Sequence, residues 1–213
     1  MNFLVRKGTS LKGEINIPGD KSMSHRAIML ASLSEGRCQI SGLLEGEDCL
    51  ATIDVFRKMG VYISSIDGNY SIEGNGLKGL KQPNEPLDFG NSGTSIRLCS
   101  GVLSAQKFAT TLLGDDSLSS RPMLRIVEPL TQMGAKISPS KDGTLPLSIL
   151  PTDSLQSIEY TLPVASAQVK SCIMFAALFA KGETKITEEV VTRNHTETTV
   201  SYTHLTLPTK RIV

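Results

Sequence analysis

Hydrophobic and polar positions along the chain follow both helical and strand-like periods, which predicts a protein of mixed helices and strands. Apolar runs with a helical period, each of about three turns, begin close to Ser22, Gly93 and Ser166. A second kind of helix is predicted in LATIDVFRKMG and LRIVEPLTQMG, which close on the same phrase. Strand patterns lie in CQISGL, FATTLL and TKITEE. Two hairpins are predicted in VYISSIDGNYSIEGN and AKISPSKDGTLPLSIL, each with a DG turn signal.

These elements recur in the same order, which indicates an internal repeat. When Ser22, Gly93 and Ser166 are aligned, each copy has a basic residue four positions later. These residues are Arg26, Arg97 and Lys170, separated by 71 and 73 positions. The unit reads helix, strand, helix, strand, strand, and an extended segment such as INIPG, LDFG or EYTLP enters it. We therefore expect an α/β lobe with a pseudo-threefold repeat of βαβαββ units, over about residues 19–85, 86–157 and 158–199, the third unit being truncated.

Both ends of the chain differ from the repeat. Residues 1–18 alternate like strands and lack the continuous apolar run of a signal peptide. After Glu197 the sequence TTVSYTHLTLPTKRIV shows no helical pattern. A reverse translation of VSYTHLTLPT is similar to the adapter of a sequencing library, so we interpret residues 200–213 as a non-native tail.

Composition narrows the class of protein. Hydrophobic residues make up 39% and charged residues 20%, as in soluble globular proteins. The net charge of +1 predicts no general electrostatic attraction to nucleic acid or membranes. Four scattered cysteines without metal-ligand spacing predict reduced thiols in the cytoplasm. The longest apolar stretch, LPVASAQVKSCIMFAALFA, contains Gln168 and Lys170 and predicts a buried helix rather than a membrane span.

The candidate chemistry lies where the three equivalent helices begin. If they run parallel, their N-termini meet, and free N–H groups with the helix dipole favour anions there. Each residue also has a simpler role. Ser22 and Ser166 suit N-caps, Arg26 and Lys170 could be solvated, and Gly93 could serve a turn. Pro122 suits the first position of a helix, with Arg121 just outside it. His25 is interpreted as structural. Together the polar and basic residues at these helix N-termini predict a site for a hydroxyl-rich small molecule carrying phosphate or carboxylate.

Five motifs in series carry a family resemblance: PGDKSMSHRA, FGNSGTSIRL, LSSRPM, ASAQVKS and TRNHTE. In order and spacing they resemble the motifs of 5-enolpyruvylshikimate-3-phosphate (EPSP) synthase, from Gly13 to Glu197. The resemblance implies two similar lobes with an active site between them. This chain would then be the N-terminal half, and residues 1–18 would belong partly to the other lobe.

The family reaction transfers the enolpyruvyl group of phosphoenolpyruvate to the 5-hydroxyl of shikimate 3-phosphate and releases phosphate. This step belongs to the shikimate pathway of aromatic amino acid biosynthesis. The resemblance implies no metal ion or organic cofactor, a cytoplasmic location, a monomeric full-length enzyme, and neither nucleic acid nor membrane as partner. The family is also the target of glyphosate, which competes with phosphoenolpyruvate, and the bare Gly93 would leave room for it.

The resemblance also implies residue roles. Lys21 matches a lysine that touches both substrates and would be a proton donor or electrostatic catalyst. The shikimate 3-phosphate ligands would be Ser22, Arg26, Ser166 and Ala167, and the phosphoenolpyruvate side would be Asn91, Gly93 and Arg121. Gln168 would lie between the substrates, and Thr192 and His195 stand where the family has Ser and Tyr or His. The main acid–base carboxylates belong to the other half of the family enzyme, so we expect this chain alone to be inactive.

Two other functions stay open. A sister enolpyruvyl transferase that acts on a UDP-amino sugar shares the fold, but it has Asn after the catalytic Lys and a loop Cys. Here Ser22 follows Lys21, and the GDDSLSSRP loop has no Cys. A non-catalytic module that binds phosphate or RNA ends on a related repeat fold is the second alternative. The near-zero net charge and the lack of an aromatic stacking stripe argue against it.

Overall fold

The computed structural model describes residues 4, 8, 12–15 and 17–202, and within them it confirms the predicted α/β class. The helices are α1 (Lys21–Leu33), α2 (Glu47–Lys58), α3 (Gly93–Leu103), α4 (Asp116–Ser119), α5 (Leu124–Gln132), α6 (Ala167–Ala177) and α7 (His195–Tyr202). The longer strands are β1 (Glu35–Ile40), β2 (Tyr62–Ile66), β3 (Asn69–Asn75), β5 (Thr110–Leu113) and β7 (Leu147–Leu150). The shorter strands are β4 (Leu87–Asp88), β6 (Lys136–Ser138), β8 (Leu155–Gln156), β9 (Glu159–Thr161), β10 (Ala180–Lys181) and β11 (Lys185–Thr187).

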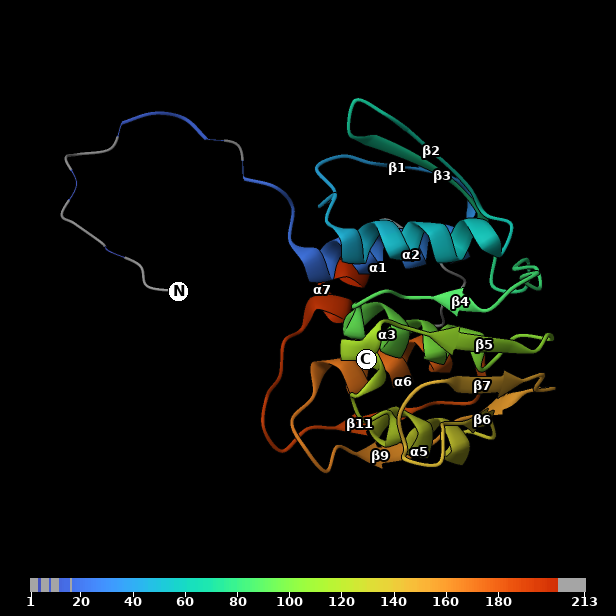
Figure 1. Ribbon diagram of the computed structural model, residues 1–213. Coiled ribbons are helices and arrows are strands. Elements are labelled where there is room, and N and C mark those ends of the chain that lie inside the picture. Colours follow the sequence, from blue (N-terminus) through green and yellow to red (C-terminus); the bar gives the residue numbers. More distant parts are fainter. Residues whose placement is uncertain (1–3, 5–7, 9–11, 16, 203–213) are drawn as a thin grey trace.

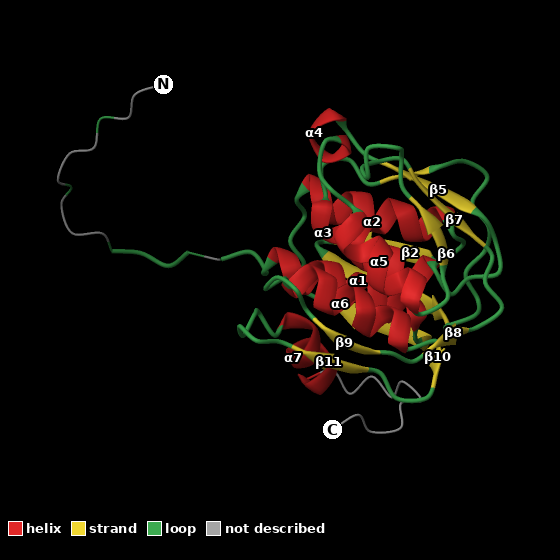
Figure 2. Cartoon of the chain, turned by 90° about the horizontal axis from the view of Figure 1, so that it is seen from below, coloured by secondary structure: helices red, strands yellow, loops and turns green. Residues whose placement is uncertain are grey.

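Helices occupy the middle of the molecule and strands lie around them (Figures 1 and 2). The first sheet has the order β1-β3-β2, and its predicted hairpin turns at Asp67 and Gly68, which both have positive φ. The second sheet has the order β4-β5-β7-β6, with β4 parallel to β5 and the other pairs antiparallel. Two parallel pairs, β8 with β10 and β9 with β11, lie on the side of α6 (Figure 2).

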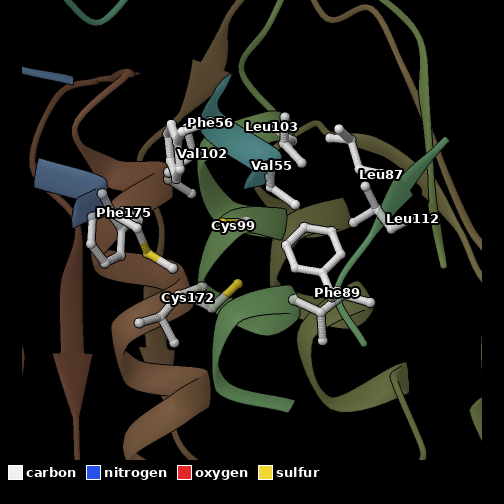
Figure 3. Packing of buried hydrophobic residues seen from close by; sticks show 14 of the residues in the cluster. Val55, Phe56, Leu87, Phe89, Cys99, Val102, Leu103, Leu112, Cys172 and Phe175 are labelled. Atoms are coloured by element: carbon white, nitrogen blue, oxygen red, sulfur yellow. The ribbon is translucent and has the colours of Figure 1, made fainter. Parts of the chain in front are cut away.

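The core forms where the apolar faces of the helices meet each other and the inner faces of the sheets. Phe56, Phe89 and Phe175 are fully buried there. Figure 3 shows Phe89 near Leu112 of β5, and Phe175 near Cys172 within α6. The helices α3 and α6 also pack closely, because Gly101 lies against the backbone of Cys172. The predicted buried helix around Lys170 is confirmed as α6. None of the described helices is long and apolar enough to cross a membrane.

All four cysteines are free thiols, and Cys49, Cys99 and Cys172 are buried. Burial raises the pKa of Cys49 to about 11 and the pKa of Cys99 to about 12. It also raises the pKa of Cys172. These thiols therefore stay protonated at neutral pH and behave as small apolar side chains.

Two predicted helix starts are wrong by a few residues. Asp20, rather than Ser22, caps α1, because its carboxylate accepts the N–H of Met23 and Ser22 already lies inside the helix. Pro122 is not the first residue of α5, because the N–H of Met123 donates to the carbonyl of Gly143 and the helix begins at Leu124. A local cap thus sets the start of α1, whereas a contact with a residue distant in sequence sets the start of α5.

The expected pairing of residues 1–18 with another lobe stays a prediction, whereas the expectation for the other end of the chain is wrong in part. Among the described residues of the N-terminal segment no strand forms, and Ile15 and Ile17 are 81% and 75% exposed. A strand needs a hydrogen-bonded neighbour, and none of the described residues provides one here. At the other end, the predicted loss of helix after Glu197 is wrong, because α7 continues to Tyr202. Contacts with α1 favour helix there despite the β-branched residues (Figure 1). Residues 203–213 of the expected tail lie outside the described residues.

Candidate anion-binding site

The first turns of α1, α3 and α6 meet, as the shared register predicted. Nη2 of Arg26 in α1 donates to the Oγ of Ser171 in α6, at 2.7 Å. Nε2 of Gln168 in α6 donates to the Oγ1 of Thr94 in α3, at 3.1 Å. Between α1 and α3, Oγ1 of Thr52 in α2 lies 2.8 Å from Nδ1 of His25 and 2.7 Å from Oγ of Ser95, and Nε2 of His25 lies 3.5 Å from Oγ of Ser92. Hydrogen bonds between these side chains therefore bring three helix N-termini to one region of the molecule.

Arginine side chains gather around the N-terminus of α3. Ser92 caps this helix, and Gly93 is its first residue. A Cβ on Gly93 would lie 2.7 Å from Nη1 of Arg97 and 3.1 Å from Nη1 of Arg121. The missing side chain is therefore what lets both guanidinium groups approach the helix mouth.

The arginine cluster has only neutral partners. Arg97 donates to the carbonyls of Gly93 and Pro122 and to Oε1 of Gln168. Arg121 donates to Oδ1 of Asn91 and to Oγ of Ser117. Among the described residues, no carboxylate forms an ion pair with Arg97, Arg121 or Arg125.

Burial, followed by the positive charges of Arg121 and Arg125, lowers the pKa of Arg97. A backbone N–H is the main cause that lowers the pKa of Asp115, and Arg121 also contributes, but that carboxylate is engaged with Asn91 and forms no ion pair with the cluster. Guanidinium groups that repel Arg97 without an ion-paired carboxylate favour an anion at this position.

A second cation stands at the start of α1. Nζ of Lys21 lies 2.7 Å from Oδ2 of Asp48, in the first turn of α2, and the lysine side chain is half exposed. Gly46 is the N-cap of α2, and Asp48 lies inside the first turn of that helix. The carboxylate of Asp48 therefore orients the ammonium group of Lys21 instead of capping its own helix.

The other two cations of the register are internal, which corrects the view of them as solvated. Arg26 is 2% exposed and donates to Thr196 and Ser171 and to the carbonyl of Ser22. Lys170 is 5% exposed and forms ion pairs with Glu188 at 2.8 Å and Glu197 at 2.7 Å. A cation at this register therefore does not by itself indicate a ligand, because two of the three hold neighbouring segments in place.

The remaining predicted residues fall into two groups. Ser166 is the N-cap of α6, where its Oγ accepts the N–H of Val169, and Ala167 is the first helical residue. Thr192 donates to Oε1 of Glu188, which also pairs with Lys170. Arg97 thus donates to Gly93 and Gln168, while Arg121, which donates to Asn91, also lies beside Gly93. Thr192 belongs to the separate Glu188 cluster.

Sequence reasoning missed Arg125 as a member of the cluster. Arg125 lies four positions after Arg121, but the turn around Pro122 hid that relation because the two residues are not on one helix. The role of Asp48 as the partner of Lys21 was also missed, because a contact between helices 27 residues apart leaves no mark on local sequence.

A separate cavity of about 290 Å³ lies between residues 83–86 and the strands β5 and β7. Its lining includes none of the helix-mouth residues and no Lys or Arg. Among the described residues, no cluster of three or more His, Cys, Asp or Glu is placed to hold a metal ion. The helix mouths, with their unpaired arginines, are the better candidate for an anion site.

Solved structures share this fold. The structure of EPSP synthase from Acinetobacter baumannii matches with a TM-score of 0.85 and 53% identity, over 87% of this chain and 42% of that chain. The architecture is therefore that of one part of an EPSP synthase.

Sequence comparison identifies the family. The model of the family described as EPSP synthase (3-phosphoshikimate 1-carboxyvinyltransferase) matches residues 5–204, and the chain belongs to this family. A 3-phosphoshikimate 1-carboxyvinyltransferase from Hydrogenovibrio crunogenus is 54% identical over 92% of this chain and 44% of the relative. One from Ruthia magnifica is 57% identical over 92% of this chain and 45% of the relative. The chain thus spans less than half the length of these relatives and corresponds to an N-terminal half.

Proposed function

We propose that this chain is the N-terminal half of an enzyme that transfers the enolpyruvyl group from phosphoenolpyruvate to the 5-hydroxyl of shikimate 3-phosphate, with release of phosphate. Relatives of this name that are 54% and 57% identical support the assignment. The activity would belong to the whole protein, since the chain matches less than half of each relative. The UDP-amino-sugar reaction and the non-catalytic module receive no comparable support.

The observation that carries the proposal is the pair of guanidinium groups of Arg97 and Arg121 beside Gly93, with Arg125 near enough to Arg97 to help lower its pKa. Both substrates are polyanions, and bringing them together costs electrostatic repulsion that fixed cations offset. Cations held before the substrates arrive also stabilise charge on a departing phosphate without further reorganisation.

On the phosphoenolpyruvate side we assign Arg121, Asn91 and Gly93. Asn91 accepts from Arg121 and donates to Oδ2 of Asp115, at 2.7 Å. It therefore fixes the direction of the guanidinium group without neutralising its charge. Gly93 keeps the approach to that group open.

On the shikimate 3-phosphate side we assign Lys21, Ser22, Arg26, Ser166 and Ala167. A guanidinium has five N–H donors, and the internal bonds of Arg26 use three of them, so it retains capacity for a phosphate oxygen. Lys21 is the proposed proton donor or electrostatic catalyst. Gln168 would lie between the substrates, and Thr192 is the more remote ligand, since its hydroxyl is engaged with Glu188.

The finer architecture is part of the proposal. The order α1, β1, α2, β2, β3 is repeated by α3, β5, α5, β6, β7, with α4 inserted, and α6, β10, β11, α7 would be an incomplete third copy. This order supports a pseudo-threefold lobe over about residues 19–199, with units of about 19–85, 86–157 and 158–199. Residues 1–18 would pair partly with the other lobe, and residues 200–213 would be non-native.

The full-length enzyme would act in the cytoplasm as a monomer, without nucleic acid, membrane or cofactor. Calorimetric titration of shikimate 3-phosphate into the purified chain tests the proposal. The wild-type chain should bind it, and Lys21→Ala should weaken binding about tenfold, as expected for loss of a charge-assisted contact. Arg37→Ala is the matched control, because Arg37 is an exposed arginine of β1 paired with Glu73. No binding by the wild-type chain, or equal weakening by both variants, would contradict the assignment.

A further inference from the structure

His25 of α1 lies at the junction of three helices and is not among the residues proposed above to contact substrate. Its imidazole is fully buried. Nδ1 is 2.8 Å from Oγ1 of Thr52 on α2, and Nε2 is 3.5 Å from Oγ of Ser92, the N-cap of α3. The ring therefore has polar partners on both sides, and each partner belongs to a different helix.

In a buried site each hydroxyl proton needs an acceptor, and this requirement selects one tautomer of the imidazole. Oγ1 of Thr52 lies 3.1 Å from the carbonyl oxygen of Asp48 and 2.7 Å from Oγ of Ser95, so its hydroxyl proton has acceptors other than Nδ1 of His25. Oγ1 of Thr52 is then free to accept a ring proton carried on Nδ1.

The other side of the ring leads to the same tautomer. Oγ of Ser92 accepts the backbone N–H of Ser95 at 3.2 Å. Among the described residues, Nε2 of His25 is the acceptor within reach of the hydroxyl proton of Ser92. If Nε2 carried the proton instead, this buried hydroxyl would have no acceptor, at the cost of an unsatisfied polar group.

Cys49 is also consistent with this tautomer. Its Sγ lies 4.0 Å from Nε2 but is placed to donate to the carbonyl of Lys21, at 3.9 Å. The thiol proton therefore has an acceptor of its own and does not need the lone pair of Nε2.

The charges that face His25 come from both helices beside it: Asp20, Lys21 and Arg26 on the α1 side, and Asp48 on α2. Burial is the main cause that lowers the pKa of His25, to about 4. Asp48 opposes the shift, and Lys21 and Arg26 add to it. The imidazole is therefore neutral over the range in which a phosphate ester is fully ionised.

We propose that His25 is a positioning residue. Neutral and protonated on Nδ1, it connects the N-cap hydroxyl of Ser92 to Thr52 and thereby sets the orientation of the first turn of α3. That this turn binds an anion rests on the proposed function, whereas the hydrogen-bonded relay from Ser92 through His25 to Thr52 exists without any ligand.

Nitrogen-15 NMR of the histidine-labelled chain at pH 7 tests the relay directly. We expect a protonated, pyrrole-type Nδ1 and an unprotonated, pyridine-type Nε2 for His25. Ser92→Ala should shift the Nε2 resonance. Ser104→Ala should not, because that buried hydroxyl of the same helix region donates to the carbonyl of Ser100. The opposite tautomer, or an Nε2 resonance that ignores Ser92→Ala, overturns the proposal.

Positioning is measured at the amide of Ser95, which donates to the N-cap oxygen of Ser92. His25→Asn keeps an N–H near the Nδ1 position but removes the Nε2 acceptor. Hydrogen exchange at Ser95 should then accelerate about tenfold. His25→Gln reaches the Nε2 position and should restore most of the protection. Unchanged exchange in His25→Asn overturns the positioning role. If that variant does not fold, the tautomer and the Ser92→Ala response still decide.

Titration of shikimate 3-phosphate into the same samples separates this inference from the proposed function. If the wild-type chain binds the ligand, His25→Asn should bind it about fivefold more weakly. If the wild-type chain does not bind it, the proposed function fails, while the tautomer and the Ser95 exchange still decide the relay. Equal affinity together with unchanged exchange would refute the positioning role.

Discussion

Gly101 of α3 packs directly against the backbone of Cys172 in α6. A Cβ on Gly101 would overlap the carbonyl oxygen of Cys172 and would lie 3.2 Å from the backbone N of Ala176. The two helices can approach this closely because position 101 has no side chain. Their approach brings Gln168 within reach of Thr94, so the packing of the core and the geometry of the helix mouths depend on each other.

Gly101→Ala should therefore destabilise the chain strongly. The added methyl group meets backbone, which cannot rotate away as a side chain would, so the helices must separate. We expect a loss of at least about 2 kcal/mol in the free energy of unfolding, measured by urea denaturation. Gly8→Ala is the control, because among the described residues no atom lies within 4 Å of a Cβ at that position. Equal stability of the two variants would show that the helix contact is looser than described.

The helices, hairpins and meeting helix mouths could be predicted because each leaves a local sequence pattern. The roles of the three matched cations could not. Arg26, Arg97 and Lys170 share one register, yet Arg26 donates to Thr196 and Lys170 pairs with Glu197, both on α7. Whether a cation stays available for a ligand depends on whether a segment distant in sequence packs over it. A local sequence pattern carries no information on such a contact. The helical conformation of residues 198–202, the C-terminal part of α7, was missed for the same reason.

Stability should fall in mild acid because of His25. Burial lowers its pKa in the folded chain to about 4, whereas the unfolded value is 6.5. Between these values the unfolded chain binds a proton that the folded chain does not. The contribution of His25 to the free energy of unfolding is therefore constant above pH 6.5. It decreases as the pH falls toward 4, by up to about 3 kcal/mol.

Urea denaturation at roughly pH 7.0, 6.0, 5.0 and 4.5 measures the dependence of the free energy of unfolding on pH. His25→Asn should remove most of it, since no titrating group remains at the position. His195→Gln, at the start of α7, should keep it. A slope that survives in His25→Asn would assign the acid sensitivity to other groups.

Lys170→Met should cost more than removal of a surface lysine. Burial alone would lower the pKa of Lys170, but hydrogen bonds to Glu188 and Glu197 outweigh it and raise the pKa. Without the ammonium group two carboxylates face each other beside a buried position. We expect a loss of about 2–3 kcal/mol in the free energy of unfolding. Lys58→Met, which removes a more exposed pair with Asp54 and Glu85, should cost less than about 1 kcal/mol. Similar losses would contradict the internal role of Lys170.

Gly93→Ala should change ligand binding with little effect on stability. The new methyl group would meet the ends of Arg97 and Arg121, which are flexible side chains and can move aside. In the full-length protein we expect weaker binding of phosphoenolpyruvate and reduced inhibition by glyphosate, with a loss below about 1 kcal/mol in the free energy of unfolding. Inhibition assays alongside thermal denaturation separate the two effects, and unchanged inhibition would rule out the steric argument.

The 213-residue chain alone should not release phosphate from phosphoenolpyruvate and shikimate 3-phosphate. The family resemblance places the active site between two lobes, and the chain matches only 44% of the relative from Hydrogenovibrio crunogenus. The described carboxylates beside these helix N-termini are engaged, since Asp20 caps α1, Asp48 pairs with Lys21 and Asp115 accepts from Asn91. Closure between lobes, which excludes water and completes a site of this kind, also needs the second lobe. Phosphate release should be measured with the purified chain, with the full-length Acinetobacter baumannii EPSP synthase as the positive control. Turnover of the chain comparable to that control would show that one lobe suffices and would refute the two-lobe mechanism.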